Sequence, residues 1–99
     1  VAYALLESKG DLNEALRKAN EAVQLAPDAA AYWETLGNIH LKKGNGEQAV
    51  QAFRTLLGKG PQTAYHRYLL AIGLELNGEG PEAIREFEQA LRSGLSAPV

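Results

Sequence analysis

The 99-residue chain contains no cysteine and no methionine, and it has only two histidines. Without cysteine it can form no disulfide framework, no thiolate nucleophile and no cysteine-ligated metal site. A cysteine-free sequence is compatible with an oxidising or a reducing compartment, so the localisation stays open.

Long apolar runs and an excess of positive charge are also missing. No run reaches the roughly 18 apolar residues of a membrane-spanning helix, so we expect no membrane insertion. Ten Lys and Arg against twelve Asp and Glu give a net charge of -2 and a pI near 5.6. This balance provides no basic surface for nucleic acid, and we expect no nucleic-acid partner.

What the sequence does contain is an internal repeat of 34 residues. Small residues and prolines return at this interval. They are Gly10, Gly44 and Gly78; Ala15, Ala49 and Ala83; and Pro27 and Pro61. Such a period is typical of a solenoid, in which no unit buries its apolar face alone and stacking completes the core.

The spacing of apolar residues predicts that each repeat is a pair of helices. The expected helices cover residues 1–9, 11–26, 30–43, 47–57, 63–77 and 81–92. We expect Gly10 to end the first of them, and Asp11 with Glu14 resembles a capping box for the second. Asp28 can cap the helix that follows it. The glycines of residues 58–60 predict a frayed helix end there.

The unit at residues 30–63 carries a recognisable set of large and small side chains, namely Trp33, Leu36, Gly37, Ala49, Phe53 and Pro61. The following unit keeps Leu70, Ala71, Ala83, Phe87 and Ala90, and the truncated first unit keeps Ala15, Ala19, Ala22 and Pro27. On these positions the chain resembles the tetratricopeptide repeat family. It departs from the family pattern at His40, Leu56, Arg67, Leu74 and Leu95.

The resemblance implies an all-α, right-handed superhelical solenoid of antiparallel helix pairs with about two and a half repeats. A single array would cover residues 1–97, with a partial repeat at 1–29 and full repeats at 30–63 and 64–97. Physics agrees with it, because Ala and Gly at fixed places let paired helices approach closely while Trp33 and Phe53 fill the space between pairs.

The resemblance also implies a function, since the first helices of successive repeats in this family line a concave groove that holds a peptide of a partner protein. The groove positions here are Glu34, Asn38, Leu41, Lys42, Tyr65, Tyr68, Ile72 and Glu75, together with Ala31, Leu76, Ala4, Glu7 and Ser8. Asn38 could hydrogen-bond a peptide backbone, and Tyr65 and Tyr68 are suitable anchors. Alternatively these tyrosines pack on an element outside the chain, whereas Leu69 and Leu70 are expected in the core. The mixed apolar and weakly acidic groove favours an apolar or mildly basic ligand segment.

Some members of the family bind chaperones by clamping a terminal carboxylate with Lys, Asn and Arg. The corresponding positions here hold Ala4, Thr35, Tyr65 and Leu69. Without those cations and amides an anionic chain terminus has little to bind it, so we do not expect a heat-shock cochaperone.

Catalysis is not expected. We predict His40 to be packed or locally hydrogen-bonded between paired helices, and His66 to pack near the preceding repeat. Ser8, Ser93 and Ser96 have no base at a motif distance. No phosphate loop or metal-ligand spacing occurs, so we expect no cofactor and no metal.

The two ends of the chain predict an alternative function as a structural scaffold segment of a longer protein. Val1 starts inside a helical pattern, and we expect the array to continue upstream and to stop near its last helix. That helix carries a polar set consisting of Arg85, Glu86, Glu88, Gln89 and Arg92. The uncapped amino-terminal face should then be partly apolar and could support a homo-oligomer.

Overall fold

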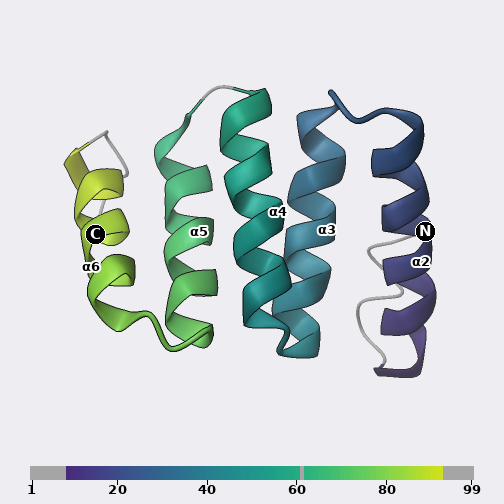
Figure 1. The fold of residues 1–99 in the computed structure, drawn as a ribbon, viewed down its shortest axis with the longest axis horizontal. Coiled ribbons are helices and arrows are strands. Elements are labelled where there is room, and N and C mark those ends of the chain that lie inside the picture. Colours follow the sequence, from purple (N-terminus) through teal and green to yellow (C-terminus); the bar gives the residue numbers. More distant parts are fainter. Residues whose placement is uncertain (1–8, 61, 93–99) are drawn as a thin grey trace, which may run out of the picture.

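The computed structural model describes residues 9–60 and 62–92, and within these ranges the chain is all-α (Figure 1). The five helices of this part are α2 (Lys9–Leu25), α3 (Ala30–Lys43), α4 (Gly46–Lys59), α5 (Ala64–Leu76) and α6 (Gly80–Arg92). Each helix packs against its neighbours in sequence, so that antiparallel helices form a row 36 Å long and 26 Å wide (Figure 1). The predicted all-α array of antiparallel helix pairs is confirmed.

The two sides of the row differ. Helices α3 and α5, the first helices of successive pairs, also contact each other. The backbones of α2 and α4, and those of α4 and α6, make no such close approach within the described helices. The row therefore closes on the side of α3 and α5 and opens on the side of α2, α4 and α6.

The tightest helix–helix contact lies between α3 and α4. Phe53 of α4 is fully buried, and its ring lies directly over the backbone of Gly37 in α3. A Cβ atom added to Gly37 would lie only 2.4 Å from Phe53 Cε1. Only glycine can occupy this position without moving the ring or the helix.

A second interface joins α4 to α5 and forms the main apolar cluster. Leu56 and Leu74, which both depart from the family pattern, are fully buried in it. Leu69 and Leu70 are buried there as predicted. Each buried leucine of this kind stabilises the fold by about 1.5–3 kcal/mol through loss of apolar contact with water.

Arg67, another departure from the pattern, is accommodated by polar partners. Its Nη1 atom lies 3.3 Å from Oε1 of Glu86 in α6, and its Nη2 atom donates to Oε1 of Gln62 at 2.7 Å. The half-buried pair of Arg67 and Glu86 thus joins α5 to α6 where the preceding repeat has Trp33 and Ala52.

Two of the three repeated glycines end helices as predicted. Gly44 and Gly78 both have φ near +81°, in the left-handed region that favours glycine. The next backbone N–H groups return to the helices, from Asn45 to His40 O and from Glu79 to Leu74 O, both at 2.8 Å. Gly10 behaves differently, because α2 begins at Lys9 and includes it. The predicted helix end at Gly10 is wrong, since a first helical turn leaves its N–H groups free of helical partners and tolerates glycine.

Several predicted helix ends are also wrong. Asp28 does not cap α3, whose N-cap is Ala29, because its carboxylate pairs with Lys59 Nζ at 3.2 Å. Asp11 lies inside the first turn of α2, and Glu14 pairs with Arg17 instead of returning to a cap. Helix α4 extends through Lys59 rather than fraying at Gly58, and the N–H of Gly60 bonds to Leu56 O at 3.1 Å.

The last helix is less polar on its outer side than the sequence predicted. Arg85, Glu88, Gln89 and Arg92 are exposed, but Glu86 is half-buried against Arg67. Ile84 and Leu91 are 58% and 57% exposed, whereas Val50 and Leu57, 34 residues earlier on α4, are 3% and 9% exposed. Helix α5 covers Val50 and Leu57 on α4, whereas no described helix covers Ile84 and Leu91 on α6.

We predict opposite stability effects for two Gly→Ala substitutions. Gly37→Ala should lower the free energy of unfolding by about 1–3 kcal/mol, because its methyl group overlaps the Phe53 ring. Gly58→Ala is the matched control, since a Cβ atom there has no neighbour within 4 Å and alanine favours the helix by up to about 1 kcal/mol. Urea unfolding followed by circular dichroism measures both, and equal effects would contradict the proposed close approach.

Candidate functional site

The eight groove residues predicted from the sequence all lie on the two helices that close one side of the row. Helix α3 carries Glu34, Asn38, Leu41 and Lys42, and helix α5 carries Tyr65, Tyr68, Ile72 and Glu75. Because α3 and α5 contact each other, these two rows of side chains adjoin. The further positions Ala4, Glu7 and Ser8 lie outside the described residues.

A hydrogen bond joins the two helices near their amino-terminal ends. His66 Nε2 of α5 donates to Glu34 Oε1 of α3 at 3.1 Å, and the side chains are 15% and 32% exposed. His66 Nδ1 is buried and has no hydrogen-bond partner among the described residues. Glu34 therefore links the two helices through one of its carboxylate oxygens. The predicted packing of His66 near the preceding repeat agrees with this position.

The two tyrosines differ in how much of the ring is available. Tyr65 is 49% exposed, and its ring lies 6.0 Å from that of His66. Tyr68 is 38% exposed and rests on Phe87 of α6, with ring centroids 5.6 Å apart and planes tilted by 56°. Tyr68 is therefore partly a packing residue, and Tyr65 is the better candidate for a contact with a ligand.

The remaining groove positions combine apolar and charged side chains. Asn38, Leu41 and Ile72 are half-buried, and Leu41 also packs against the main apolar cluster. Lys42 and Glu75 are exposed near the carboxyl ends of α3 and α5. Ala31 and Leu76 are exposed as well. The surface thus combines half-buried apolar side chains with the exposed charges of Lys42 and Glu75.

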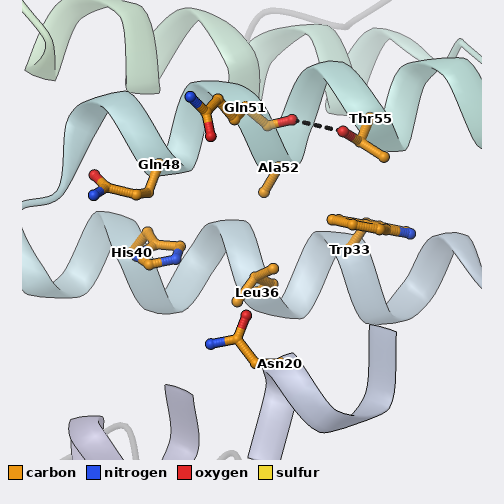
Figure 2. Close-up of a pocket in the computed structure, with 8 residues that line it drawn as sticks. All are labelled: Asn20, Trp33, Leu36, His40, Gln48, Gln51, Ala52 and Thr55. Carbon is orange, nitrogen blue, oxygen red and sulfur yellow. Dashed lines mark hydrogen bonds between the residues drawn. The ribbon is translucent and has the colours of Figure 1, made fainter. Parts of the chain in front are cut away.

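A hollow that the sequence did not predict opens on the other side of the row. It lies over α3 between α2 and α4 and has a volume of about 380 Å³. Figure 2 shows the eight side chains around it, which are Asn20, Trp33, Leu36, His40, Gln48, Gln51, Ala52 and Thr55. None of them carries a formal charge at neutral pH. The signal that could have revealed it is the set of uncharged amides on α2 and α4.

His40 forms part of this hollow and is buried, as predicted. Its Nδ1 atom lies 3.3 Å from the side-chain nitrogen Nδ2 of Asn45. Because an amide nitrogen can only donate, Nδ1 accepts and the neutral ring carries its proton on Nε2. Burial, together with the nearby charge of Lys43, holds the pKa of His40 below its ordinary value of 6.5.

The described residues offer little else for chemistry. Within residues 9–60 and 62–92 no group of three or more His, Asp or Glu side chains could hold a metal ion. None of the helices in these ranges is long and apolar enough to cross a membrane.

The repeat, the paired helices and the two surfaces define a helical solenoid of short repeats. A family model described as "Tetratricopeptide repeat" matches residues 6–72, and the chain belongs to this family. Tetratricopeptide repeats generally act as protein–protein interaction modules and are typically not catalytic. The chain is also similar to "Tetratricopeptide repeat protein 37" of Xenopus laevis, with 27% identity over 91 residues. That match includes 91% of this chain but only 6% of the Xenopus protein.

We predict that His40 makes stability depend on pH. Since its pKa is lower in the folded protein, its contribution is complete above pH 6.5 and decreases as the pH falls toward the folded pKa. His40→Gln, which can still accept a hydrogen bond from Asn45, should reduce this slope by at most about 1.4 kcal/mol per pH unit. Urea unfolding between about pH 7.5 and 5.5 measures the slope. Equal slopes for both proteins would show that His40 does not cause it.

Proposed function

We propose that the chain is a protein–protein interaction module that binds a peptide segment of a partner in the groove formed by α3 and α5. The observation that carries the proposal is Tyr65, a large aromatic side chain that stays half exposed next to His66, whose ring links α5 to α3. Tyrosine at such a position gives much contact area at a small entropic cost, which is typical of binding hot spots.

The rigidity of the surface supports this function. The Glu34–His66 hydrogen bond and the packing of Tyr68 on Phe87 hold α3, α5 and α6 in place without a ligand. A preformed surface loses less conformational entropy on association than a flexible one. Leu41 and Ile72 then favour a ligand segment with apolar residues.

Peptide display followed by affinity measurement tests this function. Random peptides would be selected on the intact chain, and the dissociation constant of an enriched peptide would be measured with each variant by calorimetry. Tyr65→Glu should weaken binding by about thirtyfold, as expected for loss of a hot spot worth about 2 kcal/mol. Asn38→Ala should weaken it by about tenfold or less.

Gln89→Glu is the matched control, because it introduces the same charge at an exposed position of α6. It should leave the dissociation constant unchanged. Equal affinity of wild type and Tyr65→Glu, or the failure of any peptide to be enriched, would exclude the groove as the binding site.

A scaffold function is the second candidate, and the exposed stripe on α6 favours it. Ile84 and Leu91 lie two helical turns apart on one face, where the equivalent residues of α4 are covered by α5. At the other end of the row, α2 and α3 border a mostly apolar hollow of about 200 Å³. It is lined by Ala15, Lys18, Ala19, Ala22, Tyr32 and Thr35. Apolar faces at opposite ends permit head-to-tail association of copies.

The scaffold function predicts association that increases with protein concentration. Ile84→Glu and, separately, Tyr32→Asp should each weaken it by about tenfold or more, since a head-to-tail contact needs both faces. Sedimentation velocity over a concentration series measures the effect, with Gln89→Glu as the control. A monomer at all concentrations would exclude the homo-oligomeric scaffold without affecting peptide binding in the groove.

A further inference from the structure

The positions that line the hollow between α2 and α4 have equivalents 34 residues later, which border the space over α5 between α4 and α6. There the two walls are joined by an ion pair, in which Arg54 Nη2 of α4 lies 2.9 Å from Glu82 Oε2 of α6. The residues 34 positions earlier, which line the hollow, are Asn20 and Gln48. Among the described residues no hydrogen bond or ion pair joins α2 to α4.

At the floor of the hollow, uncharged residues again stand where the later repeat has a charged pair. Arg67 and Glu86 form a half-buried ion pair between α5 and α6, and Trp33 and Ala52 occupy the corresponding positions of the hollow. Charged pairs thus occupy both sets of positions in the later repeat, while the hollow has uncharged side chains at all four. No ion pair therefore crosses the hollow between the described parts of α2 and α4.

We propose that this open hollow is a second ligand site, on the side opposite the groove of α3 and α5, and that it binds a short, uncharged, extended peptide segment through its backbone. Its volume of about 380 Å³ lies within the range of small-ligand sites. The proposal does not depend on peptide binding in the groove.

The arrangement of amides on both walls is what selects an extended backbone. Gln48, Gln51 and Thr55 lie on one face of α4 and extend over about 10 Å of helix axis. Asn20 faces them from α2 (Figure 2). In an extended chain, backbone N–H and C=O groups point alternately to its two edges, so both walls meet hydrogen-bonding groups. Each primary amide can donate to a carbonyl and accept from an N–H at once.

The other polar atoms of the hollow fit the same ligand. His40 is neutral and carries its proton on Nε2, because Nδ1 accepts from Asn45. Thr55 donates its hydroxyl proton to Gln51 O at 2.9 Å and keeps lone pairs to accept from a ligand (Figure 2). Trp33 Nε1 is occupied by Pro27 O at 2.7 Å. The buried side chains of Leu36 and Ala52 leave an apolar floor for one ligand side chain.

Nuclear magnetic resonance of the side-chain amides of the intact chain tests the proposal directly. The probe is the blocked, uncharged hexapeptide acetyl-Ser-Ala-Leu-Ala-Ser-Ala-amide, titrated into isotope-labelled protein. We expect saturable shifts of the NH₂ signals of Asn20, Gln48 and Gln51. The same peptide with its backbone nitrogens methylated should bind about tenfold more weakly or worse, because it cannot donate to the amide oxygens.

Two variants connect the shifts to the hollow. The double variant Asn20→Arg/Gln48→Glu copies the ion pair of Arg54 and Glu82, and it should weaken binding by at least about tenfold while circular dichroism stays unchanged. Gln51→Ala, an exposed change that should not affect folding, should weaken binding by about two- to tenfold. Gln89→Ala, at the position equivalent to Thr55, is the control and should have no effect.

Three results would overturn the proposal. The first is the absence of saturable amide shifts with the hexapeptide. The second is equal binding of the methylated peptide or of the Gln51→Ala variant, which would show that the backbone contacts do not form. The third is an equal response to glucose at the same concentration, which would indicate a site for neutral hydroxyl compounds. Tyr65→Glu should leave the shifts unchanged, so failure here and failure of groove binding remain distinguishable.

Discussion

The contact between the ring of Phe53 and the backbone of Gly37 is the constraint on which the rest of the array depends. It allows α3 and α4 to approach closely, because Gly37 has no Cβ atom that would overlap the ring of Phe53. With α4 held there, its opposite stripe of Val50 and Leu57 is available for α5. Helix α5 then reaches α3, which creates the surface that we propose as a peptide groove.

The unequal contacts on the two sides of the row give the molecule two different surfaces. On the closed side, the Glu34–His66 hydrogen bond joins adjacent first helices. On the open side, α2, α4 and α6 stand apart, and side chains alone decide whether the space between them is bridged. One such space is bridged by Arg54 and Glu82, whereas the other is bordered by neutral amides. The same backbone arrangement thus supports either a structural link or an open hollow.

The parts of the fold that the sequence predicted correctly are those that repeat. The helix pairs, the glycine turns at Gly44 and Gly78, the buried Leu69 and Leu70 and the packed His40 all follow from periodic patterns. Several errors lie at helix ends, where an acidic side chain can either cap the helix or pair with a basic side chain. Asp28 pairs with Lys59, 31 residues away, and Glu14 pairs with Arg17 on its own helix. A local capping pattern cannot include such competitors.

The sequence by itself determined the family, the paired helices and the helices that carry the candidate groove, because a 34-residue period with helical spacing is a local pattern along the chain. Only the tertiary structure decided which candidate side chains are available. It paired Glu34 with His66, 32 residues away, and placed Tyr68 on Phe87. It left the side chain of Tyr65 half exposed. It also revealed the uncharged hollow and the exposed stripe of α6. These features depend on which side chains meet across helix interfaces, and such meetings depend on three-dimensional packing rather than on local periodicity.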